Sequence, residues 1–125
     1  MKNFFLISLG GAVGTGARYL LSLAFMHWIH PAFPYSTLII NIIGSFLMGL
    51  VVQLGLNTDL IPLHLRIILT TGVLGGFTTY SAFNAEVLQH FQHGAYRSGI
   101  FHVMLMVTGC LVAGMLGLLI AKRFS

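Results

Sequence analysis

Four apolar stretches occupy most of this chain and leave little sequence between them. Only 6% of its 125 residues are charged, whereas a typical soluble domain has about 25%. Each stretch is close to the roughly 20 residues that an α-helix needs to cross a bilayer. We therefore expect an all-α integral membrane protein, a single domain over residues 1–125, with transmembrane helices at about Phe4–Met26, Thr37–Leu56, Ile61–Leu88 and Ser98–Ala121.

The few charged residues exclude some functions and bear on orientation. Six basic and two acidic residues give a net charge of +4, which is too little charge for a nucleic-acid surface. Four spans would place both termini on one side of the membrane. Counting basic residues on each side gives only a small bias toward cytoplasmic termini, and a small bias is compatible with two opposite orientations in one membrane.

The third stretch contains a run, Thr70–Phe83, with three glycines and four threonines. We expect Gly75 and Gly76, followed by Thr78 and Thr79, to interrupt the helix. Irregular backbone at membrane depth has to be buried in protein or line an aqueous path. Freed carbonyls could hold a cation, and freed N–H groups favour an anion. The alternative is a glycine kink that serves packing alone.

A polar stripe is predicted on the second helix. Asn41 lies near the middle of this span, where an unpaired amide is costly to bury. Thr37 and Ser45 lie one helical turn to either side of it and share its face. The amide is either an anion ligand or one partner of an interhelical hydrogen bond, and the sequence leaves both alternatives open.

Other candidate residues also have two interpretations each. Tyr80 and Phe83 would share a helix face, either as packing or because their positive ring edges help to hold an anion. Arg18 lies within the first span and could attract anions or anchor the helix at the interface. Glu86 could titrate in a vestibule or pair with a basic group.

Histidines and small residues recur at regular spacing. The pairs His27/His30 and His90/His93 have a metal-like spacing, but interfacial histidines are the better interpretation. His102 could form a hydrogen bond in a pore or within the bundle. Small residues four apart let helices approach closely in lipid and predict a compact bundle; they are Gly10 and Gly14, Gly72 and Gly76, and Gly109, Ala113 and Gly117.

These motifs, in order across three spans, resemble the small fluoride channel family (Fluc, also called CrcB). The third-span motif is the most specific part. The matching residues are Gly10-Gly11-Ala12-Val13-Gly14 with Arg18-Tyr19, Ser36-Thr37-Leu38 with Asn41 and Gly44, Thr70-Thr71-Gly72, the run from Gly75 to Phe83, and Glu86.

The resemblance implies an antiparallel, dual-topology homodimer in a bacterial cytoplasmic (inner) membrane, conducting fluoride passively through two pores. It also implies a structural sodium ion at the dimer interface, held by the backbone carbonyls of Gly75 and Thr78 from both subunits. Arg18 and Glu86 would belong to the vestibule. The pore residues would be Thr37, Asn41, Thr79, Tyr80, Ser81 and Phe83.

This chain departs from the family pattern at three places. Tyr80 stands where phenylalanine is usual, and Ala82 where threonine is usual. The fourth helix has His102, Met106, Thr108 and Cys110 where some relatives carry a tyrosine and serines.

Two other functions also fit four short spans. A small multidrug-type, proton-coupled transporter would need a membrane-embedded carboxylate, but the first two spans contain none and Glu86 is near the end of the third. A noncatalytic membrane subunit explains the hydrophobicity but not the ordered polar motifs.

Overall fold

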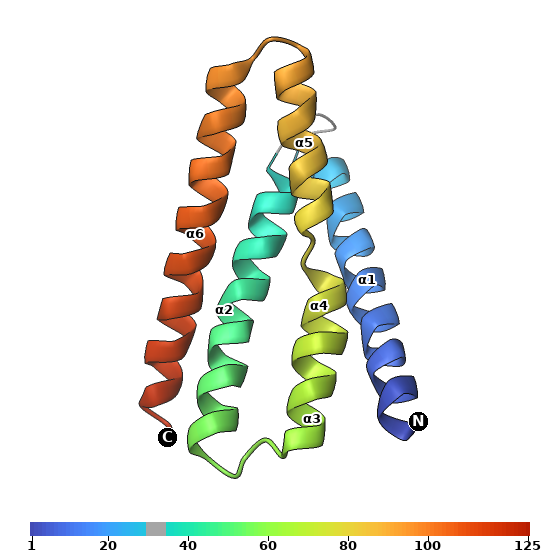
Figure 1. The fold of residues 1–125 in the computed structure, drawn as a ribbon, viewed down its shortest axis with the longest axis vertical. Helices are drawn as coiled ribbons and strands as arrows, with labels where there is room; N and C mark the ends of the chain where they lie inside the picture. Colours follow the sequence, from blue (N-terminus) through green and yellow to red (C-terminus); the bar gives the residue numbers. More distant parts are fainter. Residues whose placement is uncertain (30–34) are drawn as a thin grey trace.

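The structure is a computed structural model that describes residues 1–29 and 35–125, and its regular elements in this part are all helices. The chain forms a bundle with both termini at the same end (Figure 1). This confirms the all-α class. His30, of the predicted pair His27/His30, lies outside the described residues. In chain order the elements are α1 (Lys2–Trp28), α2 (Ser36–Asn57), α3 (Leu63–Ile67), η1 (Ile68–Leu74), α4 (Gly75–Phe77), α5 (Tyr80–Gln92) and α6 (Tyr96–Lys122).

Three helices are long and apolar enough to cross a membrane, and within residues 1–29 and 35–125 these are α1, α2 and α6. The first, second and fourth predicted spans fall inside them. The third predicted span, Ile61–Leu88, is instead divided among α3, η1, α4 and α5, and its helical residues begin at Leu63 and end at Gln92. These four elements follow one another along the bundle beside α1 and α2 (Figure 1).

The division of the third segment follows from its residues. The turns of η1 are π-helical, a form in which each N–H binds the carbonyl five residues back and which often occurs at functional sites. Thr78 and Thr79 then have extended backbone between α4 and α5, which suits β-branched side chains. The Thr79 hydroxyl accepts from the N–H of Ala82 at 3.2 Å and so caps the N-terminus of α5.

Glycines let α1 lie directly against the first half of the third segment. A Cβ atom on Gly14 would collide with the carbonyl of Val73, and one on Gly76 would collide with the carbonyl of Gly11. The predicted small-residue pairs of the first and third spans therefore face each other within one chain. Glycines bring α2 and α6 together in the same way, because a Cβ on Gly117 would collide with the carbonyl of Phe46.

A small apolar core holds the second half of the third segment. It joins α2, α5 and α6 through the buried side chains of Leu38, Phe83, Val87 and Met106. In contrast, many large apolar side chains of α1 and α6 are exposed. Such a surface suits lipid or another subunit rather than water.

Candidate functional site

The Asn41 side chain of α2 bridges to the extended residues of the third segment. Its Nδ2 donates to the carbonyl of Thr79 at 3.0 Å, and its Oδ1 accepts from the N–H of Thr79 at 2.9 Å. The amide thus binds both polar groups of one residue's backbone, much as a neighbouring peptide would. Asn41 is 8% exposed, so this pairing satisfies polar groups that would be costly to bury alone.

The same amide has a second N–H group, and it has a weak partner. Asn41 Nδ2 lies 3.5 Å from the Met106 sulfur, and a thioether is a poor hydrogen-bond acceptor. Of the two alternatives predicted for Asn41, the structure shows the hydrogen bond to a neighbouring segment. It leaves one buried donor that a stronger acceptor would take from Met106.

The extended residues also remove the helical donors of two carbonyls. In a continuous helix the N–H of Thr79 would bind the carbonyl of Gly75, and that of Ala82 would bind the carbonyl of Thr78. Here these N–H groups bind Asn41 Oδ1 and the Thr79 hydroxyl instead. The carbonyls of Gly75 and Thr78 lose these partners, and such oxygens are chemically suited to a hard cation.

Arg18 of α1 contacts the backbone next to these carbonyls. Its Nε donates to the Gly76 carbonyl at 3.2 Å, and the Thr15 hydroxyl donates to the same oxygen at 3.4 Å. A cation is stabilised beside backbone carbonyls at the end of a helix. The hydrogen bond from the guanidinium is part-buried, and it ties α1 to α4 in this chain.

Glu86 of α5 is the centre of a second polar cluster. The Thr37 hydroxyl donates to Glu86 Oε1 at 2.6 Å, and His102 Nε2 lies 2.9 Å from Glu86 Oε2. His102 is buried, and the Glu86 side chain is 30% exposed. Of the two alternatives for Glu86, the structure shows pairing, with a histidine as the partner. The sequence indicated each of these residues separately but not their contact.

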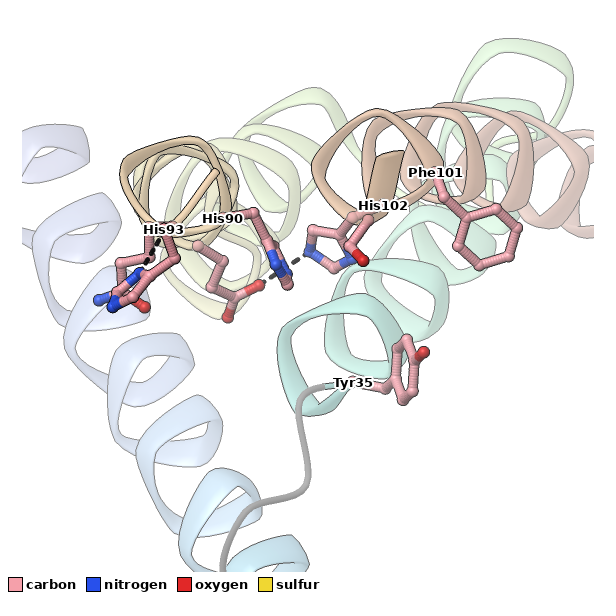
Figure 2. A pocket seen from close by; sticks show the side chains of 8 residues that line it. Tyr35, His90, His93, Phe101 and His102 are labelled. Carbon is pink, nitrogen blue, oxygen red and sulfur yellow. Dashed lines mark hydrogen bonds and ion pairs between the residues drawn. The ribbon is translucent and has the colours of Figure 1, made fainter. Parts of the chain in front are cut away.

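The Glu86 cluster borders a cavity between α5 and α6. Figure 2 shows His102 pointing into this region from α6, with His90 and His93 on the neighbouring helix. The cavity has a volume of about 560 Å³. Its lining residues are Tyr35, Glu86, Gln89, His90, His93, Ser98, Phe101 and His102.

Two rings connect the cavity to the Asn41 region. Phe83 is buried, and its ring lies 5.3 Å from the His102 ring and 5.6 Å from the Tyr80 ring, the latter at 75° in an edge-to-face arrangement. The predicted contact between Tyr80 and Phe83 therefore exists. Their environments differ, because the Tyr80 side chain is 77% exposed.

An open groove of about 670 Å³ runs over α2, α5 and α6. Four of the six predicted pore residues line it: Asn41, Thr79, Tyr80 and Phe83. The other two lie elsewhere. Thr37 binds Glu86, and the exposed Ser81 hydroxyl is 3.2 Å from that of Thr79. Met106 and Cys110 of α6 also form part of the wall of this groove. The sequence had indicated both residues only as departures from the family pattern.

The histidine pair His90/His93 forms no metal centre with other side chains in the described parts of the chain. His93, which follows α5, has its Nδ1 2.7 Å from the carbonyl of Gln89 in the last turn of that helix. His90 instead has its ring 6.2 Å from that of His102. The cavity role of His90 was not predicted, since its spacing to His102 follows from packing and not from any local motif.

Comparison with known proteins places these features in a family. Residues 5–118 match the family described as "CrcB-like protein, Camphor Resistance (CrcB)". The chain belongs to this family. A relative from Sorangium cellulosum is 43% identical over 98% of this chain and 97% of its own length, and one from Ruminiclostridium cellulolyticum is 41% identical over 100% of this chain and 96% of its own.

The names of the relatives indicate what kind of protein they are. One from an Anaeromyxobacter species is 40% identical over 98% of this chain and 97% of its own length. Each is named "Fluoride-specific ion channel FluC", which describes an ion channel and not an enzyme. With three helices of membrane-spanning length and composition, family membership supports an integral membrane protein.

Proposed function

We propose that this chain is a fluoride-selective channel that lets fluoride leave a bacterial cell passively across the cytoplasmic membrane and so protects against fluoride toxicity. The observation that carries the proposal is the Asn41 amide, which reaches the extended residues with one N–H and faces the weak acceptor Met106 with the other. Fluoride is small and strongly hydrated, so a pore has to replace its water with close donors without holding it too tightly. The names of the CrcB relatives support the same ligand.

The proposed path uses neutral groups along the groove. Asn41 supplies an amide donor, Thr79 a hydroxyl, and Tyr80 and Phe83 their ring edges. None of these carries a fixed charge, so an ion that they bind can also leave. The driving force is the membrane potential, which is worth about 2.3 kcal/mol per charge for each 100 mV and pushes an anion out of a negative interior.

A second copy of the chain completes this proposal. The groove is open and Tyr80 is largely exposed, which suits a pore whose second wall comes from a partner. In an antiparallel, dual-topology homodimer two such paths form, and the broken segment from α3 to α5 crosses the membrane as a fourth span. Residues 1–125 then form one transmembrane domain of four spans.

We further propose a structural sodium ion where the two copies meet. The carbonyls of Gly75 and Thr78 fit this role because the extended residues remove their helical donors, and Gly75 is exposed. Two such carbonyls from each chain would provide neutral oxygen ligands. The bound cation would add a positive charge that helps to join the subunits.

Fluoride efflux from liposomes tests the proposal. Purified protein is reconstituted in liposomes loaded with potassium fluoride, efflux is started with a potassium ionophore, and external fluoride is followed with an electrode. We expect fast fluoride efflux and far slower chloride efflux. Lack of fluoride flux from demonstrably folded dimers rejects the channel, and cation uptake driven by a proton gradient supports the small multidrug-type alternative.

Two aromatic substitutions locate the path. Phe83→Leu should reduce fluoride flux because it removes the buried ring edge, while Phe4→Leu, at a 62% exposed position on α1, is the matched control and should leave it unchanged. Tyr80→Phe keeps the ring and removes the hydroxyl. Equal flux in Tyr80→Phe and the natural protein would show that conduction does not need this hydroxyl, and normal flux in Phe83→Leu would reject the role of that ring.

A further inference from the structure

The cavity between α5 and α6 is lined by an acidic side chain, which disfavours an anion. Glu86 is the one carboxylate among its described lining residues, and these include no lysine or arginine. An ionised Glu86 would repel fluoride, and Coulomb repulsion is stronger in a partly buried site than in water. An anion path through this cavity therefore needs a compensating positive charge, and the side chains in contact with Glu86 decide whether it has one.

The contacts of Glu86 supply one neutral and one titratable partner. The Thr37 hydroxyl, at 2.6 Å, can donate a hydrogen bond but no charge. The His102 imidazole, at 2.9 Å, is the one of the two that can become a cation. An ionised Glu86 accepts from both, which places a proton on His102 Nε2. A second proton on Nδ1 would make the ring positive and the pair neutral.

Other titratable groups surround the pair, but at greater distance. His90 of α5 faces His102 with its ring 6.2 Å away. His93, which follows α5, contacts the carbonyl of Gln89, and Tyr35 lies on the wall next to α2. The ring of Phe83 packs beside His102, 5.3 Å away. His102 is thus the titratable side chain that directly contacts the carboxylate.

We propose that His102 is a positioning residue for anion entry, which acts through Glu86. A protonated His102 offsets the negative charge of the carboxylate, and the neutral pair lets fluoride enter the cavity. This inference rests on the proposed channel function. The proton comes from a hydronium ion of the solvent, so one O–H bond breaks as the N–H bond of His102 forms, and loss of the proton reverses this. With the proton bound, the pair has no net charge. Without it, the pair has one negative charge.

The sign of the pH effect follows from these two charge states. Acid protonates His102, neutralises the pair and raises fluoride flux, whereas alkali leaves Glu86 uncompensated and lowers it. We expect a higher protein-dependent rate at pH 5 than at pH 8. Hydrogen fluoride crosses lipid unaided at low pH, so the rate from protein-free liposomes is subtracted at each pH.

Three variants test the mechanism. Glu86→Gln removes the negative charge that His102 compensates, so its flux at pH 8 should be clearly higher than that of the natural protein at pH 8. His102→Gln keeps a hydrogen-bond donor but cannot become charged, so its flux should be low and also independent of pH. The double variant keeps neither charged group of the pair, so its flux should be high at pH 8 and independent of pH. His64→Gln, an exposed histidine on α3 at the opposite end of the bundle, should keep the natural pH profile.

The outcomes are separable. A natural protein that conducts fluoride at the same rate from pH 5 to pH 8 overturns this inference and leaves the channel intact. A flux at pH 8 in Glu86→Gln that is no higher than that of the natural protein overturns it as well, even if His102→Gln does not fold. Folded protein with no fluoride flux at any pH removes the channel proposal together with this inference.

Discussion

Replacement of Asn41 by alanine should destabilise the protein because it breaks two hydrogen bonds at once. The substitution leaves both the N–H and the carbonyl of Thr79 without their partner. Interhelical hydrogen bonds in membrane proteins average about 0.6 kcal/mol with a maximum near 1.7, which gives about 1.2 to 3.4 kcal/mol for two. Leaving a buried polar group unpaired adds to this cost. We expect a loss of about 2 to 4 kcal/mol in the free energy of unfolding.

The matched control is a substitution at another asparagine on the same helix. Asn57 also donates through Nδ2 to a backbone carbonyl, that of Gln53 at 3.2 Å, but it is exposed and the bond lies within its own helix. Asn57→Ala should change stability by no more than about 0.5 kcal/mol, as is usual for surface substitutions.

Unfolding in mixed micelles, with increasing sodium dodecyl sulfate and the helix signal followed by circular dichroism, measures both variants. We expect a clearly lower midpoint for Asn41→Ala alone. Equal midpoints for the two variants, or a loss below about 0.5 kcal/mol for Asn41→Ala, the size typical of a surface substitution, would show that the amide does not hold the extended residues in place.

Two further predictions concern packing and the proposed cation. Gly14→Ala should cost about 1 to 3 kcal/mol of stability, the usual range for overpacking, because its Cβ would collide with the Val73 carbonyl. Gly16→Ala has nothing within 4 Å and should instead gain up to about 1 kcal/mol from helix propensity; similar results for both in the same micelle assay would contradict close packing of α1. Replacement of sodium by N-methylglucamine on both sides of the membrane should lower fluoride flux and the dimer fraction on cross-linking, and unchanged values would argue against carbonyl ligands at Gly75 and Thr78.

The sequence was most informative where composition alone determines the secondary structure. Long apolar runs fix α1, α2 and α6, because a helix is the form in which a single segment satisfies its own backbone in lipid. The run of glycines and threonines pointed to the part of the third segment where Thr78 and Thr79 are extended. It did not predict the π-helical turns of η1, which packs against α1.

The sequence alone could not show which side chains contact one another. Glu86 and His102 are 16 positions apart, and Asn41 is 38 positions from Thr79. Which of these groups meet depends on how helices are rotated and shifted against one another. A single sequence contains the polar residues but not this register. It therefore left two interpretations for Asn41, Glu86 and His102, and the structure shows a contact for each.

The two halves of the third segment are held by different neighbours. Glycine contacts and Arg18 hold η1 and α4 against α1, while the core with Val87 holds α5 against α6. The third segment thus changes its packing partner at Thr78 and Thr79, from α1 to α6. The backbone at that change of partner is held from the side by Asn41 of α2, which binds both polar groups of Thr79, so one side chain fixes the position where the two kinds of packing meet.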